Sequence, residues 1–286
     1  MSAEVFDDRR CILGEGPLWH PERAQLFWFD IMRHRLLSRD ANGALEWRFD
    51  EPVSAAGWVD IDTLLIASAS SLWRFDLRDG SKTQLCGLEQ DNPVTRSNDG
   101  RADPWGGFWI GTMGRNAEGG AGAIYRFYQG KLHKLFGEIT IPNAICFAPN
   151  RSCAYFTDTS TQKVMRVALD SDGWSEAEPV PFLDLSAEDL NPDGAVVDQN
   201  GTVWIAQWGA ARVAAYAPDG AFLRAVAVPG LHTTCPVFGG ADFRTLYVTS
   251  ARQGLSADVA HDQSPNGQTF AVHGVTEGRP EPRVIL

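Results

Sequence analysis

Short, largely continuous apolar stretches recur along the chain at an almost even spacing. Six of them share a run of aromatic and β-branched residues: 26–30, 64–68, 108–112, 154–158, 203–207 and 246–250. Their first residues lie 38 to 49 residues apart, about 44 on average, which is within the range of a β-propeller blade. A second, alternating stretch follows each one, and turn-forming pairs such as Asn42-Gly43 and Asp79-Gly80 close many of these stretches. Each unit therefore predicts three or four short antiparallel strands.

Six such units predict an all-β fold, a six-bladed β-propeller with a central metal site, in which residues 1–286 form a single domain. A β-sandwich, or a pair of sandwiches, also consists of many short strands, but the even spacing over the whole length favours the propeller. Residues 258–267 are the least regular part, and we expect a loop there within the last blade. Because an open ring would leave sheet edges unpaired, we expect residues 4–12 to close it by pairing with that blade.

Charge and composition narrow the class of protein. The chain has 36 acidic and 25 basic residues, a net charge of −11, which argues against binding to a nucleic-acid backbone. No apolar run approaches the roughly 18–20 residues of a membrane-spanning helix, and the N-terminal MSAEVFDDRR lacks the order of a signal peptide. The five scattered cysteines form no CxxC pair. We therefore expect a cytoplasmic protein with neither nucleic-acid nor membrane partners; the sequence leaves the oligomeric state open.

Polar side chains occur at one repeated position, 10 or 11 residues before the apolar stretch of a unit. They are Glu15, Asn98, Asn143 and Asp193, in the first, third, fourth and fifth units. Taken singly, each could be an ordinary turn residue, since glycine or proline flanks several of them. Their shared phase instead predicts that they start the innermost strands and converge at one mouth of the central channel.

Two carboxylates and an amide oxygen form a hard-oxygen site for one divalent cation. Ca²⁺, Mg²⁺ and Mn²⁺ suit such ligands, and Zn²⁺ or Fe²⁺ could occupy the same site. Three protein ligands would leave coordination positions for water and substrate, as a catalytic metal requires. The sequence has no H-E-x-x-H motif, no G-x-S-x-G elbow and no phosphate-binding GxxxxGK motif.

The sequence resembles the SMP-30/gluconolactonase/luciferin-regenerating-enzyme-like family over nearly its whole length. The order and spacing of several short motifs carry the resemblance: Leu-Gly-Glu-Gly-Pro at 13–17, Arg-Ser-Asn-Asp-Gly at 96–100, Gly-Thr-Met at 111–113, Pro-Asn at 142–143, Pro-Asp-Gly at 192–194 and Phe-Gly-Gly at 238–240. One departure is Ala144, where the family often has glycine.

The resemblance implies a six-bladed propeller with one divalent metal on its axis. Glu15, Asn143 and Asp193 match the metal ligands of the family, and Arg96 and Asn98 match residues that contact its substrates. Asp99 is an expected neighbour of the site. An acidic substrate contact that follows Gly-Thr-Met in the family has no direct match, because Arg115-Asn116 stands there; Glu118, which is offset, is the expected counterpart.

The function that the resemblance implies is metal-dependent hydrolysis of an aldonic acid lactone, a sugar lactone with a pentono or hexono skeleton, to the open-chain acid. Asp193 is the first candidate for the general base that takes a proton from water, and Asp99 is the second. Two alternatives use the same metal site. One is a phosphotriester hydrolase, and the other is a non-enzymatic calcium-binding propeller.

Overall fold

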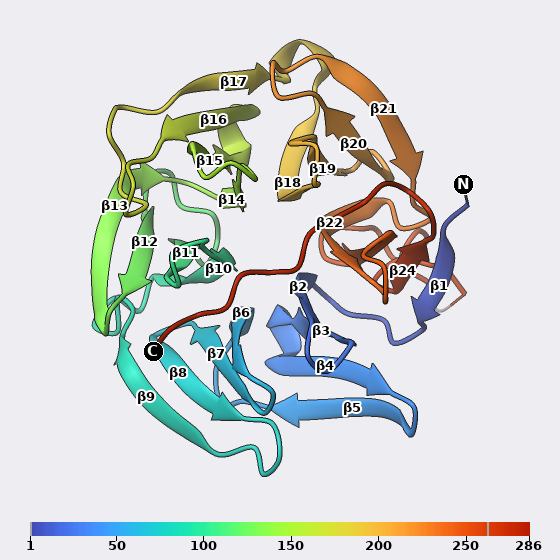
Figure 1. The fold of residues 1–286 in the computed structure, drawn as a ribbon. Helices are drawn as coiled ribbons and strands as arrows, with labels where there is room; N and C mark the ends of the chain where they lie inside the picture. Colours follow the sequence, from blue (N-terminus) through green and yellow to red (C-terminus); the bar gives the residue numbers. More distant parts are fainter. Residues whose placement is uncertain (1, 262) are drawn as a thin grey trace.

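Antiparallel strands arranged around a central axis make up the computed structural model, which describes residues 2–261 and 263–286 (Figure 1). Four sheets have four strands each, consecutive along the chain. The first sheet consists of β2 (Gly14–His20), β3 (Gln25–Asp30), β4 (Arg35–Asp40) and β5 (Gly43–Arg48). The second consists of β6 (Val53–Asp60), β7 (Thr63–Ser68), β8 (Ser71–Asp76) and β9 (Lys82–Gly87). The third consists of β10 (Thr95–Ala102), β11 (Phe108–Gly114), β12 (Gly122–Tyr128) and β13 (Lys131–Ile139). The fourth consists of β14 (Pro142–Phe147), β15 (Cys153–Asp158), β16 (Lys163–Ala168) and β17 (Val180–Asp184).

The last sheet has eight strands and includes the N-terminal one. Its members are β18 (Asn191–Val197), β19 (Val203–Trp208), β20 (Arg212–Tyr216), β21 (Phe222–Ala227), β22 (His232–Gly239), β23 (Thr245–Ala251), β24 (Thr269–Val272) and β1 (Glu4–Asp7). Three single-turn 3-10 helices complete the described elements: η1 (Ile31–Arg33), η2 (Thr159–Thr161) and η3 (Ser186–Glu188). No helix in the described part of the chain combines the length and the apolar character needed to cross a membrane.

An all-β, propeller-like ring is therefore confirmed, but residues 2–261 and 263–286 do not form the expected six separate sheets. The hydrogen bonds form five sheets, because β19 and β22 join the last two repeat units at a single residue pair, Trp208 and His232. The rings of these two residues also stack, with centroids 4.0 Å apart. The innermost strands β2, β6, β10, β14, β18 and β22 surround the axis (Figure 1).

The repeated apolar stretches form the second strand of each unit, where both faces are covered. Trp28, Trp109 and Trp204 lie on β3, β11 and β19 and are fully buried in the core between neighbouring sheets. A strand buried on both faces has a continuous rather than an alternating apolar sequence. These tryptophans therefore pack neighbouring sheets against one another.

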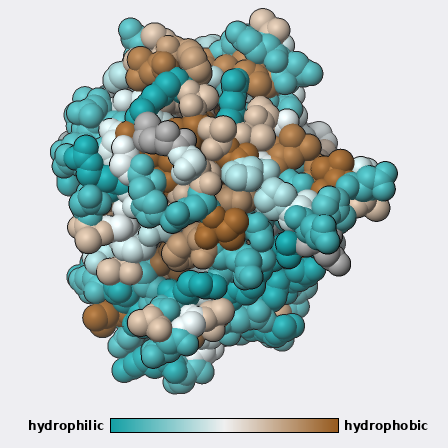
Figure 2. Space-filling view, turned by 90° about the vertical axis from the view of Figure 1, so that its right-hand side faces the viewer, coloured by the Kyte–Doolittle hydropathy of each residue, from teal (hydrophilic) through white to brown (hydrophobic). Residues whose placement is uncertain are grey.

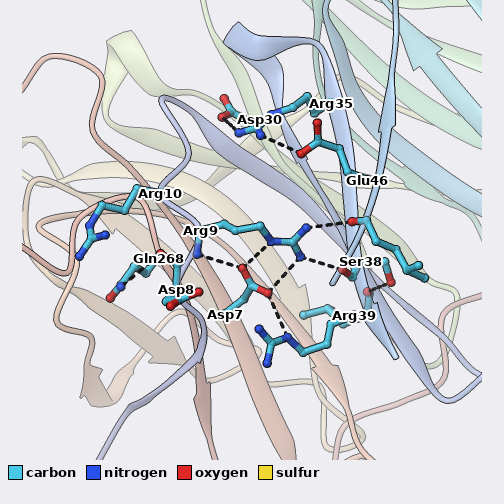
Figure 3. A network of polar contacts seen from close by, with 12 residues as sticks. Asp7, Asp8, Arg9, Arg10, Asp30, Arg35, Ser38, Arg39, Glu46 and Gln268 are labelled. Atoms are coloured by element: carbon cyan, nitrogen blue, oxygen red, sulfur yellow. Dashed lines mark hydrogen bonds and ion pairs between the residues drawn. The ribbon is translucent and has the colours of Figure 1, made fainter. Parts of the chain in front are cut away.

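The N-terminal strand closes the ring, as expected. Strand β1 pairs antiparallel with β24, and the Cys11 amide donates to the Gly267 carbonyl. Figure 3 shows how the residues after β1 then reach the first sheet: Arg9 donates from Nη2 to the Ser38 carbonyl over 2.7 Å. The buried Asp7 carboxylate accepts hydrogen bonds from Arg9 and from Arg39 of β4. These contacts fasten the last sheet to the first.

The outer side of the ring near β1 is mostly hydrophilic, with small separate hydrophobic patches (Figure 2). Residues 252–268, which join β23 to β24, contain no strand among their described members, in agreement with the loop expected at 258–267; residue 262 lies outside the described residues.

Candidate functional site

A cavity of about 630 Å³ collects most of the residues that the sequence singles out. Its lining includes Glu15 from β2, Arg96 and Asn98 from β10, Asn143 from β14 and Asp193 from β18, each near the N-terminal end of an innermost strand. All five are buried. The shared phase along the sequence thus corresponds to a shared place in the fold.

Irregularities in the inner strands follow the site residues directly. The pairing register shifts between Glu15 and Leu18, between Asn143 and Cys146, and between Pro192 and Ala195. Such bulges bend a strand and change the direction of its side chains.

The residue after a site residue takes the left-handed conformation at two of these bulges. Gly16 has a φ of 53°, and a Cβ there would lie 2.1 Å from the Ser54 carbonyl oxygen, so only glycine fits. Ala144 has a φ of 56°, a conformation that favours glycine. The structure thus gives a physical reason for the glycine that the family often has at this position.

A chain of hydrogen bonds connects three sheets across the cavity. Arg96 donates from Nη1 to Oδ1 of Asn98 over 2.9 Å, and Asn98 donates from Nδ2 to Oδ1 of Asn143 over 3.0 Å. Asn143 in turn donates from Nδ2 to the Thr159 hydroxyl over 2.9 Å, and that hydroxyl donates to the Pro192 carbonyl over 2.8 Å. Because the Thr159 proton goes to Pro192, its oxygen must accept from Asn143. The order of donors and acceptors therefore fixes which way the Asn143 amide faces.

The carboxylates of the site have unfavourable surroundings for negative charge. Burial, followed by repulsion from Asp99, raises the pKa of Glu15 to about 8. The Gly16 amide and Arg96 oppose this shift, because each favours the charged carboxylate. Burial and then repulsion from Glu15 and Asp99 also raise the pKa of Asp193 well above its usual range. Burial lowers the pKa of the Arg96 guanidinium to about 10. Buried carboxylates that repel one another are either protonated or balanced by a cation.

The donor set fits a divalent cation of oxygen-binding character. Glu15 and Asp193 supply carboxylates to the cavity, and Asn143 supplies an amide oxygen whose orientation is fixed. Within the described ranges, no group of three or more His, Cys, Asp or Glu side chains is arranged to hold a metal ion. A site here therefore depends on the amide oxygen as its third protein ligand.

Two of the expected residues lie apart from the cavity lining. Asp99 is buried behind it, and its Oδ2 accepts a hydrogen bond from the Ile145 amide over 2.8 Å. Glu118 turns toward Asn116 of its own loop and accepts from its Nδ2 over 3.0 Å, while Arg115 and Asn116 do line the cavity. The offset of Glu118 in the sequence thus corresponds to a carboxylate held within the loop, and its placement does not support the expected substrate contact.

The repeated position used in the sequence analysis did not identify the other residues that line the cavity, because they lie at a different place in the repeat. Thr159 and Ser160 belong to η2, Trp208 ends β19, and Gln253 follows β23. These residues come after the second strand of a unit rather than at the start of the first. Comparing the ends of the second strands would have found this group.

A known protein family matches most of the chain. The family model described as the SMP-30/Gluconolactonase/LRE-like region matches residues 13–252. The chain belongs to this family. The resemblance seen in the sequence is thereby confirmed. The segments 13–17, 96–100, 142–143 and 192–194, which carry the resemblance, supply several of the residues that line the cavity.

Relatives of this SMP-30/gluconolactonase/LRE-like protein include named lactonases. The chain is 36% identical to an L-arabinolactonase of Azospirillum brasilense over 276 residues, 94% of this chain and 90% of the relative. It is 32% identical to a 6-deoxy-6-sulfogluconolactonase of Pseudomonas putida over 279 residues, 95% of this chain and 94% of the relative. A crystal structure described as a calcium-binding protein, regucalcin, from Agrobacterium tumefaciens strain C58 is similar with a TM-score of 0.96 and 39% identity, covering 100% of this chain and 98% of that one.

Proposed function

We propose that this protein hydrolyses the ester bond of an aldonic acid lactone, with one divalent cation held by Glu15, Asn143 and Asp193. The observation that carries the proposal is the cavity itself, where two buried carboxylates that repel each other face a fixed amide oxygen and a guanidinium. The lactonase names of the relatives support the reaction class, and the calcium-binding description of the similar crystal structure supports the cation. We also interpret the eight-stranded sheet as two blades of a six-bladed propeller, since one residue pair joins its halves.

A divalent cation bound there would act as a Lewis acid toward the lactone carbonyl. The protein contributes the rest of the chemistry through its own side chains. Arg96 donates both of its fixed hydrogen bonds from Nη1, to Ser97 and Asn98. Its remaining N–H groups can therefore face the cavity and hold the sugar hydroxyls, which supplies orientation.

Asp193 is the residue that we place as the general base. A general base must lie within hydrogen-bond reach of the water whose proton it takes, and Asp193 lines the cavity whereas Asp99 does not. Water forms the new C–O bond at the carbonyl carbon, and the ring ester C–O bond breaks. The proton that leaves water ends on the former ring oxygen, which becomes a hydroxyl of the open-chain acid. Asp99, held by the Ile145 amide, contributes a buried charge behind the site.

A panel of substrates tests the proposal. Pentono- and hexonolactones and one phosphotriester would be given to metal-stripped protein restored with Ca²⁺, Mg²⁺, Mn²⁺, Zn²⁺ or Fe²⁺, with acid release followed by a pH indicator. Cation-dependent hydrolysis of at least one aldonolactone is the expected result. Faster turnover of the phosphotriester would favour the alternative hydrolase, and cation binding without any turnover would favour a calcium-binding propeller; either result contradicts the proposal.

A further inference from the structure

A single buried guanidinium connects the strands that carry two of the candidate cation ligands. Arg101 of β10 donates from Nε to the Ile145 carbonyl of β14 over 3.1 Å and from Nη2 to the Ala195 carbonyl of β18 over 2.9 Å. Ile145 lies two residues after Asn143, and Ala195 lies two residues after Asp193. The Ile145 contact is therefore made inside the irregular part of a ligand strand, and the Ala195 contact at the end of the irregular part of the other.

Ordinary sheet hydrogen bonds cannot set the spacing of these strands. Among the described residues β10, β14 and β18 belong to three different sheets and share no ladder. Side chains must therefore fix their separation, and β10 supplies three of them, Asn98, Asp99 and Arg101. Asp99 accepts from the Ile145 amide while Arg101 donates to the Ile145 carbonyl, so both polar groups of this peptide segment are held from one strand.

The counter-ion of Arg101 comes from the far end of the chain. Arg101 forms a buried ion pair through Nη1 with Glu281, in the C-terminal segment. Figure 1 shows this segment, in dark red, crossing the middle of the ring toward the second and third sheets. Trp58 donates from Nε1 to the Glu281 carbonyl over 2.8 Å, and the Val284 amide donates to the Trp58 carbonyl over 2.8 Å. Glu281 is thus held in place by the second sheet.

We propose that Arg101, with Glu281 as its counter-ion, is a positioning residue for the cation site. It holds Asn143 and Asp193 at the separation at which their oxygens can bind one ion, an inference that rests on the proposed function. Partners that orient metal ligands commonly change metal affinity 10–100-fold when they are replaced. A lysine at position 101 keeps the charge but has one donor nitrogen, so it cannot reach Ile145, Ala195 and Glu281 together.

The chain offers a matched control in another buried ion pair of the third sheet. Arg126 donates from Nε to Asp103 over 2.7 Å, and both side chains are fully buried. The Arg126 guanidinium lies 4.3 Å from the ring centre of Tyr128 and 4.4 Å from that of Trp174. None of these partners lines the cavity. Replacing Arg126 therefore removes a buried guanidinium fork of the same kind without touching the ligand strands.

The test compares full-length wild type with Arg101→Lys, Glu281→Gln and Arg126→Lys. Calorimetric titration measures the Kd for Ca²⁺, Mn²⁺ and Zn²⁺ separately, metal-free melting gives the loss of stability, and kcat and KM are measured on an aldonolactone. We expect Arg101→Lys and Glu281→Gln to weaken binding of the tightest ion about tenfold or more, and Arg126→Lys to change it less than twofold at a comparable drop in Tm. Glu281→Gln keeps the test decisive if Arg101→Lys fails to fold.

The outcomes separate this inference from the proposed function. Wild-type affinity in Arg101→Lys or in Glu281→Gln overturns the positioning role and leaves lactone hydrolysis intact. An equal loss of affinity in Arg126→Lys also overturns it, because the effect would then be general destabilisation. A wild type that binds an ion but hydrolyses no lactone contradicts the proposed function alone, while the order of affinities still decides the role of Arg101. A wild type that binds none of the ions contradicts both.

Discussion

Asn98 donates a hydrogen bond from its side-chain amide to the Oδ1 of Asn143 over 3.0 Å, although the two residues belong to different sheets. The contact places the family's expected substrate residue directly against an expected metal ligand. Because Asn143 also donates to Thr159, the amide group of Asn143 is held at both ends. Protein side chains thus set the orientation of an expected metal ligand.

Replacing Thr159 by valine tests this organisation. The variant keeps the shape but removes the acceptor for the Asn143 amide and the donor to the Pro192 carbonyl. We expect cation affinity to fall roughly tenfold, measured by titration calorimetry. Ser160→Ala is the control, since Ser160 lines the same cavity from the same 3-10 helix. Equal affinities in both variants and the wild type would contradict the orienting role of Thr159.

The protein should be less stable with alanine at position 144 than with glycine there. Its φ of 56° is costly for a residue with a Cβ, so Ala144→Gly should raise the free energy of unfolding by about 1 kcal/mol. Ala214→Gly, in the middle of β20, should instead lower it by roughly 0.5–1 kcal/mol. Urea unfolding measures both. A destabilised Ala144→Gly variant would show that the contacts of the methyl group outweigh the backbone conformation.

Ring closure by the N-terminal segment gives a third prediction. Asp7→Asn removes the buried charge that pairs with both Arg9 and Arg39. We expect the free energy of unfolding to fall by about 2 kcal/mol. This is less than the usual cost of breaking a fully buried ion pair, because both arginines are partly exposed. Deleting residues 1–12 should lower Tm more strongly, since β24 would lose one of its two partner strands. Asp8→Asn is the control at an exposed neighbour. An unchanged Tm after the deletion would reject closure by this segment.

The cation should stabilise the protein more as the pH rises. The pKa of Glu15, raised to about 8 by burial and by Asp99, means that without metal its charging costs stability progressively between about pH 4.5 and pH 8. The cation binds the charged form, so the difference in Tm between metal-loaded and chelated protein should grow from pH 5 to pH 8. Thermal melts with and without chelator measure it. A difference that is constant or shrinks with pH would contradict binding at Glu15.

Much of this arrangement could be predicted from the sequence because it repeats. Four residues share one position in the repeat and lie near the start of an innermost strand: Glu15, Asn98, Asn143 and Asp193. Counting positions along the sequence was therefore enough to predict that they lie together. The joining of two repeat units at Trp208 and His232 could not be predicted, since it depends on one residue pair at the ends of two strands.

Contacts between distant parts of the chain could not be predicted from the sequence for a different reason. Arg101 and Glu281 are 180 positions apart, and Glu281 lies in a segment that follows no repeat. The substrate contact expected of Glu118 stays a prediction: its residue type suggested the contact, and in the structure the hydrogen bonds of its loop hold it against Asn116. Residue type and spacing define strands well, whereas the direction of a loop side chain depends on neighbours that the spacing does not specify.

The most direct measurement of the central claim is the rate of aldonolactone hydrolysis by metal-stripped protein before and after a divalent cation is restored, in wild type, Asp193→Asn, Glu15→Gln and Asp99→Asn. The account predicts negligible turnover without cation, recovery in wild type, and a loss of about 100-fold or more in Asp193→Asn at saturating cation. Glu15→Gln should lose activity through weaker cation binding, and Asp99→Asn should retain more activity than Asp193→Asn. Full activity in the metal-free wild type, or a wild-type rate in Asp193→Asn, would contradict it.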